Sequence, residues 1–319
     1  MTAVAVLGAT GFVGTAITEH LRESGIDVHR VLAPRLTSSG TTSDDLLAQL
    51  SARDDLIDEL SRCLDGADCV VNAAGVADAT GGDWHSLCGA NALLPLVVQR
   101  ACREVGVKRL IHVSSAAVQG RRHRLDESDG RHAFSAYSRS KVLAEESLQR
   151  MGPRPHTVLF RPTSVHGPSR SVTQSLARLA ASKAASVAGE GQSPTPQVLV
   201  DNVGAAVAFV ATCLETPPPI VLQPWEGLTT AGLLRVLGGR EPRRVPTGVA
   251  RRLVTAASWA GRQHVRIAGH ARRLEMVWFG QDQERGWLAT KGWQPPVGKE
   301  GWRRLASTVH SNVRVGDGS

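Results

Sequence analysis

The sequence has few aromatic residues and a single tyrosine. Aromatic side chains make up 4% of the 319 residues, and Tyr137 is the only tyrosine. Proteins that bind single-stranded nucleic acid interleave aromatic with basic side chains, because the bases stack on the rings. The sequence has no such interleaving and no nucleic-acid-binding motif, so nucleic acid is not an expected partner.

Cysteine is scarce as well, and its spacing excludes two kinds of site. The five cysteines form no Cys-x-x-Cys pair and have no matching pair of histidines. Zinc sites and small disulfide scaffolds depend on such spacings. We therefore predict no metal site, and reduced, mostly buried thiols at Cys63, Cys69, Cys88, Cys102 and Cys213.

Long apolar segments are also missing. No run approaches the roughly 20 residues that a membrane-spanning helix needs. The first apolar run follows Met1 almost directly, without the basic segment of a secretory signal. A cytoplasmic protein is expected, and the net charge of +8 favours an anionic ligand such as a nucleotide or diphosphate.

The N-terminal segment has the pattern of a dinucleotide-binding turn. Ala3 to Leu7 is an apolar, β-branched run typical of a buried strand, and the pattern from Thr15 to Leu21 predicts a helix. Glycines between them permit a tight turn and bring a pyrophosphate to the helix N-terminus. The predicted cofactor contacts in this turn are Gly8, Thr10, Gly11, Phe12, Val13 and Gly14.

The residue after the second strand indicates which dinucleotide binds. The strand expected from Asp27 to Leu32 leads into Ala33-Pro34-Arg35, and no carboxylate follows until Asp44. An acidic residue at this place would hold the ribose hydroxyls of NAD, whereas an arginine accommodates the 2′-phosphate of NADP. The sequence therefore favours NADP(H), with Arg35 as a contact; the alternative is a solvated loop arginine.

Strands alternate with helices along the first two thirds of the chain, which predicts a doubly wound parallel α/β sheet. Functional groups then belong at the carboxyl ends of strands. Strands are expected at 69–71, 110–113 and 158–160, and no third strand can be placed between 33 and 68. The residues after these strands, together with one at the start of the next helix, are predicted to contact cofactor: Ala73, Ala74, Gly75, Asn91, Ser114, Pro162, Thr163 and Ser164.

Tyr137 and Lys141 form a candidate acid/base pair. They are four residues apart, so on a helix they share one face. A free phenol has a pKa near ~10, and a neighbouring cation favours the phenolate and lowers that value. Such a pair can pass a proton to or from a carbonyl oxygen. A surface tyrosine with an incidental lysine is the alternative, and the upstream strand ending in Ser115 argues against it.

The C-terminal third has a different composition. Five of the seven tryptophans lie in the last quarter of the chain, and 249–276 is a basic amphipathic stretch. We expect residues 1–168 and about 197–225 to form the cofactor domain. A smaller substrate-binding lobe is expected at 169–196 and 226–312, with a disordered tail at 313–319.

Taken together, these motifs resemble the extended short-chain dehydrogenase/reductase superfamily, in its sugar-nucleotide epimerase/dehydratase branch. The resemblance covers about residues 1–225 and is weaker beyond it, where Gly292-Trp293 and Glu300-Gly301-Trp302 are similar to the ending of surface-polysaccharide epimerases and 4-ketoreductases. The motifs that carry it, in order, are Gly8-x-x-Gly11-x-x-Gly14, Asn72-Ala-Ala-Gly75, Ser114-Ser115, Tyr137-x-x-x-Lys141, Arg161-Pro162 and Val200-Asp201-Asn202.

The resemblance implies a Rossmann fold and a catalytic set of Ser115, Tyr137 and Lys141. Lys141 would lower the pKa of Tyr137 and hold the nicotinamide ribose. Two departures affect the substrate side, since Gln119 and His166 stand where the family usually has tyrosines. The predicted substrate contacts are Gln119, His166 and Arg170.

The implied reaction is hydride transfer at a ring carbon, most often C4, of a nucleotide-linked sugar. Epimerisation and net reduction both remain open, and Arg35 favours reduction because NADPH is usually a consumed reductant. A non-catalytic nucleotide-binding protein and a reductase of a non-sugar carbonyl are the alternatives. The resemblance also implies a homodimer through the helices beginning near Asn91 and Tyr137. A peripheral membrane contact through 249–276 is a side hypothesis, against arginines that simply face solvent or a soluble diphosphate.

Overall fold

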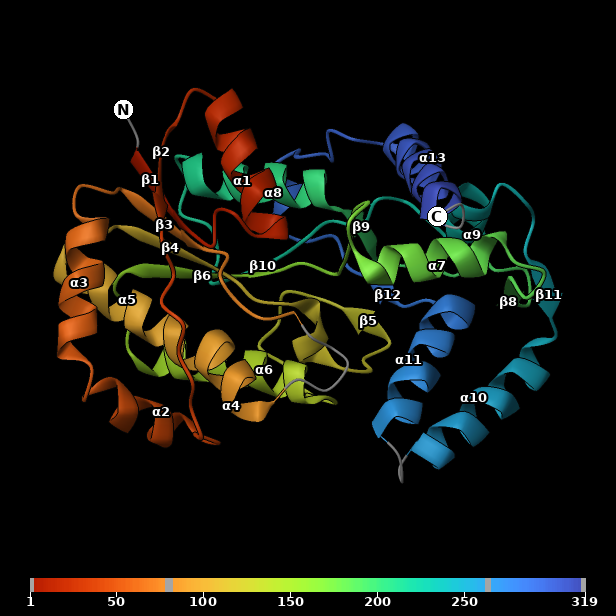
Figure 1. The fold of residues 1–319 in the computed structure, drawn as a ribbon, viewed down its shortest axis with the longest axis horizontal. Helices are drawn as coiled ribbons and strands as arrows, with labels where there is room; N and C mark the ends of the chain where they lie inside the picture. The colour runs from red at the N-terminus through yellow and green to blue at the C-terminus, as the bar shows by residue number, and fades with distance from the viewer. Residues whose placement is uncertain (1–2, 78–82, 262–264, 317–319) are drawn as a thin grey trace.

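The computed structural model describes residues 3–77, 83–261 and 265–316, and its centre is a six-stranded parallel sheet (Figure 1). The strand order is β10-β6-β4-β3-β1-β2. This confirms the predicted doubly wound α/β fold. The strands are β1 (Ala3–Leu7), β2 (Asp27–Val31), β3 (Cys69–Asn72), β4 (Arg109–Val113), β6 (His156–Arg161) and β10 (Ile220–Leu222).

Helices cover both faces of the sheet, because successive strand residues point to opposite sides. In β1, Val4 and Val6 pack in a cluster with α1 and α8, while Ala5 and Leu7 pack toward the helices on the other face. Four of the five cysteines are buried or partly buried, as expected. The covering helices are α1 (Phe12–Glu23) and α8 (Val200–Thr212) on one face, and α2 (Ser43–Leu50), α3 (Asp54–Leu64), α5 (Leu94–Glu104) and α6 (Ala136–Arg150) on the other.

The segment without a predicted third strand is helical. Between β2 and β3 the chain forms α2 and α3, so β2 is the edge of the sheet. Thr42 and Asp45 form a capping box that starts α2. The α2 helix lies against α6, where Ser43 and Ser147 are hydrogen-bonded at 3.0 Å. The α3 helix lies against α5.

A second group of elements has its own hydrophobic cluster, formed mainly by α7, α9 and α13. The first helix of this group ends at Ala181, and a short strand follows it. The helix α13 runs to Gly316, so residues 313–316 are helical rather than a disordered tail; 317–319 lie outside the described residues. The group comprises α7 (Ser171–Ala181), β8 (Ser186–Ala188), α9 (Thr230–Gly238), β11 (Arg243–Val245), α10 (Thr247–Gly261), α11 (Val265–Phe279) and α13 (Lys299–Gly316).

Asn202 joins the two groups of elements. Its buried side chain donates to the Glu226 carboxylate at 2.6 Å and exchanges two hydrogen bonds with the Val297 backbone. Glu226 also accepts from the Trp302 indole at 2.7 Å. Burial raises the pKa of Glu226 to about 7. The Val-Asp-Asn motif therefore fixes the C-terminal segment to α8.

The remaining elements are short. The turn α12 packs on β10 through Leu288, although its residues fall inside the predicted lobe. No helix of the described residues is long and apolar enough to cross a bilayer. The short elements are α4 (Trp84–Cys88), η1 (Gly89–Leu93), η2 (Ala116–Gln119), β5 (Arg124–Leu125), β7 (Ser164–His166), β9 (Gln197–Leu199), β12 (Asp282–Gln283) and α12 (Trp287–Thr290).

Candidate active site

Tyr137 lies in the first turn of α6, which starts at a capping box. The Ser135 hydroxyl accepts from the Ser138 N–H at 3.1 Å, and the Ser138 hydroxyl accepts from the Ser135 N–H at 2.9 Å. The cap fixes where the helix begins, and thus places Tyr137 and Lys141 one turn apart on the same face. Lys141 donates to the carbonyl of Val113, the last residue of β4, at 2.9 Å. The Lys141 ammonium therefore lies at the carboxyl end of β4.

The surroundings of the phenol differ from the expectation in one respect. Burial raises the pKa of Tyr137, while the Ser115 hydroxyl and the positive charge of Arg170 lower it. Lys141 is not among these influences, since its ammonium is held by Val113. The predicted lowering of the phenol pKa by Lys141 is therefore not found, and the net shift is upward because burial outweighs Ser115 and Arg170. Burial lowers the pKa of Lys141 itself to about 8, against the attraction of Glu145.

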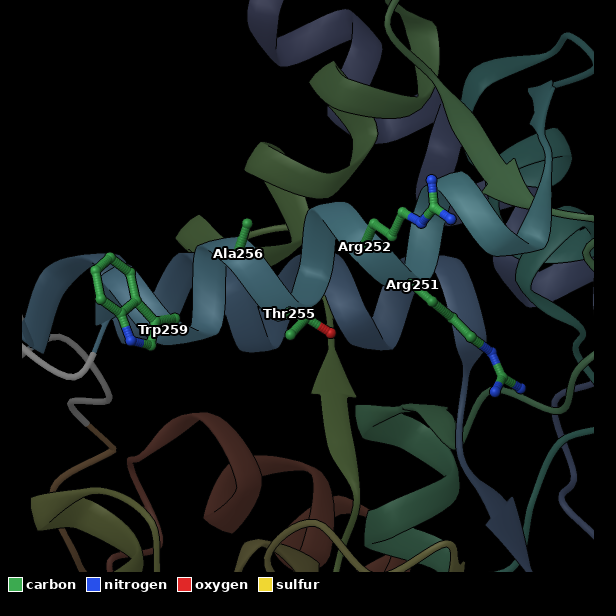
Figure 2. A pocket seen from close by; sticks show the side chains of 5 residues that line it. All are labelled: Arg251, Arg252, Thr255, Ala256 and Trp259. Carbon is green, nitrogen blue, oxygen red and sulfur yellow. The ribbon is translucent and has the colours of Figure 1, made fainter.

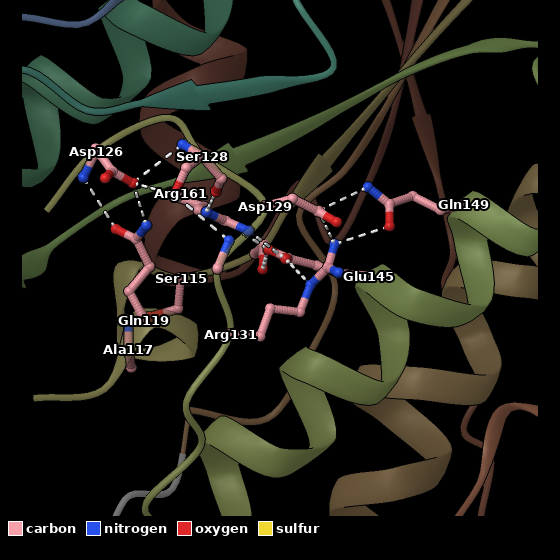
Figure 3. Close-up of polar contacts among 12 residues, drawn as sticks. Ser115, Ala117, Gln119, Asp126, Ser128, Asp129, Arg131, Glu145, Gln149 and Arg161 are labelled. Atoms are coloured by element: carbon pink, nitrogen blue, oxygen red, sulfur yellow. Dashed lines mark hydrogen bonds and ion pairs between the residues drawn. The ribbon is translucent and has the colours of Figure 1, made fainter. Parts of the chain in front are cut away.

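Glu145 lies one helical turn beyond Lys141 and links the parts of the site (Figure 3). Its fully buried carboxylate accepts from the Ser114 hydroxyl at 2.6 Å and from the Arg131 guanidinium at 2.9 Å. Arg161, at the end of β6, donates two further bonds at 3.0 and 2.7 Å. A buried ion pair is stable only when its remaining donors and acceptors are satisfied, and Arg161 also donates to the Ser128 carbonyl.

This network was not predicted from the sequence. It joins β4, α6, β6 and the loop before Tyr137, so it fixes the elements that carry Ser115 and Lys141 relative to one another. The signal was Tyr-x-x-x-Lys-x-x-x-Glu, because a third polar residue at the same spacing continues the inward face of α6. The hydroxyl of Ser114, which was predicted to contact cofactor, donates its hydrogen bond to Glu145.

The glycine turn fits a dinucleotide pyrophosphate. Gly8 has φ +75°, and a Cβ there would lie 2.7 Å from the backbone of Ala74. A Cβ on Gly14 would clash with the Gly8 carbonyl, whereas a Cβ on Gly11 would have only that carbonyl nearby, at 3.1 Å. Thr10 and Gly11 are exposed, and α1 begins at Phe12 with no side-chain cap and no acid in its first turn. Its N-terminal N–H groups are therefore available to an anion, with Phe12, Val13 and Gly14 in that turn.

The segment after β3 is shaped by Asn91. This buried side chain accepts from the Val76 N–H and donates to the Val76 carbonyl, both at 2.9 Å, and donates to Ser140 at 3.1 Å. A Cβ on Gly75 would lie 2.7 Å from Asn91 Oδ1 and 3.5 Å from Lys141 Nζ. Asn91 thus holds Gly75 close to Lys141 through the two hydrogen bonds of its amide to Val76.

Two buried polar atoms at the carboxyl ends of β3 and β6 have no partner in the described residues: Asn72 Nδ2 and Thr163 Oγ1. A bound ligand at this edge would satisfy them. Beside Thr163, the Pro162 carbonyl accepts from the Ala116 N–H, and the exposed Ser164 hydroxyl contacts His166. Of these predicted cofactor contacts, Thr163 is the one whose buried hydroxyl has no partner in the described residues and is left for a ligand.

Arg35 and Arg170 bring positive charge to this edge. Arg35 is exposed and follows the carboxyl end of β2, the strand beside β1. Arg170, just before α7, places its guanidinium 5.1 Å from the centre of the Phe12 ring. Arg170 therefore lies near the first turn of α1, whereas Arg35 lies beyond the end of the neighbouring strand.

The other two predicted substrate contacts, Gln119 and His166, form hydrogen bonds with other residues of the protein. Gln119 is fully buried and exchanges two hydrogen bonds with Asp126. His166 is also buried, bonds Gln197 at 2.6 Å and Thr173 at 3.0 Å, and packs on Trp302. Burial lowers the pKa of His166 to about 4. Both side chains connect structural elements, so neither is free to contact a substrate in this structure.

Comparison with solved structures shows the same fold. UDP-glucuronic acid 4-epimerase from Bacillus cereus, in complex with NAD, has a TM-score of 0.65 at 15% identity, with 98% of this chain and 99% of that chain covered. A human epimerase family protein with NADPH has a TM-score of 0.66 at 18% identity, with 96% and 99% covered. The neighbours therefore bind either nicotinamide cofactor.

Comparison of the sequences identifies a relative and a family. A ketoreductase of a farnesylated dihydroquinoline oxide from Stigmatella aurantiaca is 29% identical over 175 residues, which is 51% of this chain and 50% of that protein. The chain thus spans about half the length of this curated relative. The model of the NAD dependent epimerase/dehydratase family matches residues 4–221, which include the glycine turn, Ser115, Tyr137 and Lys141. The chain belongs to the NAD dependent epimerase/dehydratase family.

Proposed function

We propose that this protein is an NADP(H)-dependent ketoreductase that acts on a nucleotide-linked sugar, most simply at C4. The observation that carries the proposal is the Tyr137 phenol beside the Ser115 hydroxyl, at the sheet edge that also holds the glycine turn. Its supporting features are Arg35 beyond β2 and the similarity to a ketoreductase. The epimerase neighbour from Bacillus cereus, at 15% identity, indicates the fold rather than the reaction.

In this proposal Tyr137 donates a proton to the carbonyl oxygen as the carbon is reduced. Ser115 holds the same oxygen, and Lys141 lies beside the segment Ala73 to Gly75, where a nicotinamide ribose would be held. A bound reduced nicotinamide supplies the hydride. The phenol is protonated at neutral pH, as an acid in the direction of reduction must be, and Ser115 and Arg170 oppose the rise in its pKa that burial causes.

Arg170 favours a substrate with a diphosphate. Its guanidinium lies over Phe12 and acts on Tyr137, so it faces both the glycine turn and the reacting centre. A nucleoside diphosphate sugar places a doubly charged group a short distance from its ring carbonyl. This geometry suits Arg170, whereas Gln119 and His166 do not contribute.

The test is an assay of the purified protein with NADPH and nucleoside diphosphate 4-keto sugars. We expect loss of absorbance at the reduced-nicotinamide band, one NADPH for each carbinol formed. Interconversion of two nucleotide sugars by tightly bound NAD, without net absorbance change, would establish epimerisation instead. Turnover that is unaffected by Tyr137→Phe would point to a different site or a non-catalytic role.

A reductase of an apolar, non-sugar ketone is the second candidate, favoured by the name of the Stigmatella aurantiaca relative. The same assay with an aryl ketone bearing a prenyl chain separates the two. Mass spectrometry of the product should show a gain of two hydrogens. A preference for this ketone over every nucleotide sugar would replace the first substrate class and leave the reaction type intact.

A further inference from the structure

The helix α10 is apolar on two faces. Ala250 and Val254 are buried against the rest of the second group, while Val249, Leu253 and Trp259 are 48%, 50% and 67% exposed. The spacing of Val249, Leu253, Ala256 and Trp259 places them on one face of the helix. Three of the nine large hydrophobic side chains that are exposed in the described residues therefore lie on this one helix.

The exposed side of α10 also carries positive charge. Arg251 and Arg252 are exposed and, with Thr255, Ala256 and Trp259, line an open depression of about 490 Å³ (Figure 2). In Figure 2 all of these side chains come from α10 itself. The sequence has eight arginines and no acidic residue between Glu241 and Glu275. An exposed apolar stripe with arginines and no acids is typical of helices that lie at a membrane interface.

The charge distribution decides between partners for this face. A second copy of the chain would bring another set of arginines against the first in a two-fold contact, where like charges repel. Nucleic acid would neutralise the arginines, but it would not bury the exposed aliphatic side chains of Leu253 and Val249, since bases stack on aromatic rings. An anionic bilayer satisfies both features, because headgroups pair with arginines and the acyl boundary takes up apolar side chains.

We propose that α10 docks on the surface of an anionic phospholipid bilayer, with Leu253 and Trp259 inserted. Arg252, which lies between them on the helix, and Arg251, at the flank, would reach the headgroups. The helix has 15 residues and would lie in the plane of the interface. The contact would hold the site near the bilayer, because α11 is tied to the loop after Ser115. Arg272 donates to the Gly120 carbonyl at 3.3 Å, and Gln281 donates to the Arg122 carbonyl at 2.6 Å.

Co-sedimentation of the full-length protein with vesicles tests this proposal. The protein should pellet with phosphatidylglycerol/phosphatidylcholine vesicles at low salt, and remain in solution with phosphatidylcholine alone. Leu253→Ser with Trp259→Ser should reduce partitioning about tenfold or more, because the inserted apolar surface is lost. Arg251→Glu with Arg252→Glu should have an effect of similar size, since each basic residue near such a surface contributes a several-fold gain.

Matched controls come from elsewhere on the surface. Leu214→Ser removes a fully exposed leucine just beyond α8, and Arg103→Glu reverses an exposed arginine on α5. Both should pellet like the wild type, and all variants should keep the wild-type circular dichroism spectrum. The proposal is overturned if the wild type stays in solution with anionic vesicles, or if the serine variants pellet as well as the wild type. A lower molar mass of the serine variants without vesicles would also overturn it, in favour of a second copy on this face.

Discussion

Tyr137 is the only phenol available to this site. Family members usually have further tyrosines near the substrate, but here the equivalent positions hold Gln119 and His166, both buried and hydrogen-bonded to the protein. No neighbouring tyrosine can therefore replace Tyr137 as an acid. The groups that tune it are Ser115 and Arg170, so removal of its hydroxyl tests the chemistry without changing the charge of the site.

Tyr137→Phe should lower kcat by about 10²- to 10⁴-fold, the usual contribution of a positioned acid. The dissociation constant for NADPH should change little, because the glycine turn and Lys141 remain in place. Steady-state kinetics and cofactor fluorescence titration measure the two quantities. Ser115→Ala is the companion variant, with a smaller loss expected. Equal losses in turnover and cofactor affinity would mean that Tyr137 mainly shapes the site.

Lys141→Met should stabilise the free protein while it abolishes turnover. The pKa of Lys141 is lowered to about 8, so below that pH the fold holds an ammonium that it disfavours. Glu145 keeps Arg131 and Arg161 as partners after the substitution. We expect a gain of about 1–2 kcal/mol in the free energy of unfolding at pH 7, after loss of the bond to Val113.

The stabilisation by Lys141→Met should depend on pH, and the lowered pKa of Lys141 fixes the direction of this dependence. Between pH 8 and the ordinary lysine pKa of 10.5, the unfolded chain binds the proton more tightly than the folded chain. Wild-type stability therefore rises over this window relative to the variant, and the difference should shrink as the pH approaches 10. Urea titrations at pH 7 and 9.5 measure it. A destabilisation of equal size at both values would show that the ammonium is needed for the fold.

At the scale of elements, local patterns were predicted well and long-range pairings were not. The strand-glycine-helix unit and the Tyr/Lys helix depend on neighbouring residues, and both were placed correctly. The bonds of Glu145 to Ser114, Arg131 and Arg161 join residues 14 to 31 positions apart, and only the folded sheet brings them together. The partners of His166 could not be predicted for the same reason, since Gln197 and Trp302 come from other elements.

The proposed preference for NADP depends on Arg35, which follows the end of β2. Arg35→Ala should raise the dissociation constant for NADPH about tenfold and leave that for NADH unchanged, as expected when one charge-assisted contact to a 2′-phosphate is lost. Isothermal titration with both cofactors measures it. Arg30→Ala is the matched control, because Arg30 is an exposed arginine within β2. An equal change for NADH and NADPH would remove the basis for assigning NADP.

At the scale of the molecule, α2 and α3 affect assembly. The family resemblance implied a dimer through α5 and α6, but these helices are covered by α2 and α3 of the same chain. The residues of α5 that remain exposed are Arg100, Arg103 and Glu104, and none of the nine exposed large hydrophobic side chains in the described residues lies on α5 or α6. Stable dimers instead bury a largely apolar surface.

We therefore expect a monomer in solution, with a mass of 33.9 kDa by light scattering after gel filtration at micromolar concentration. A dimer through α5 and α6 would require α2 to leave, breaking the Ser43–Ser147 bond and the Asp44–Arg150 ion pair at 2.6 Å. Twice the monomer mass would contradict this prediction. If that mass persisted in the Leu253→Ser/Trp259→Ser variant, the contact would lie outside α10, and hydrogen exchange in α2 would show whether the covering helix had been displaced.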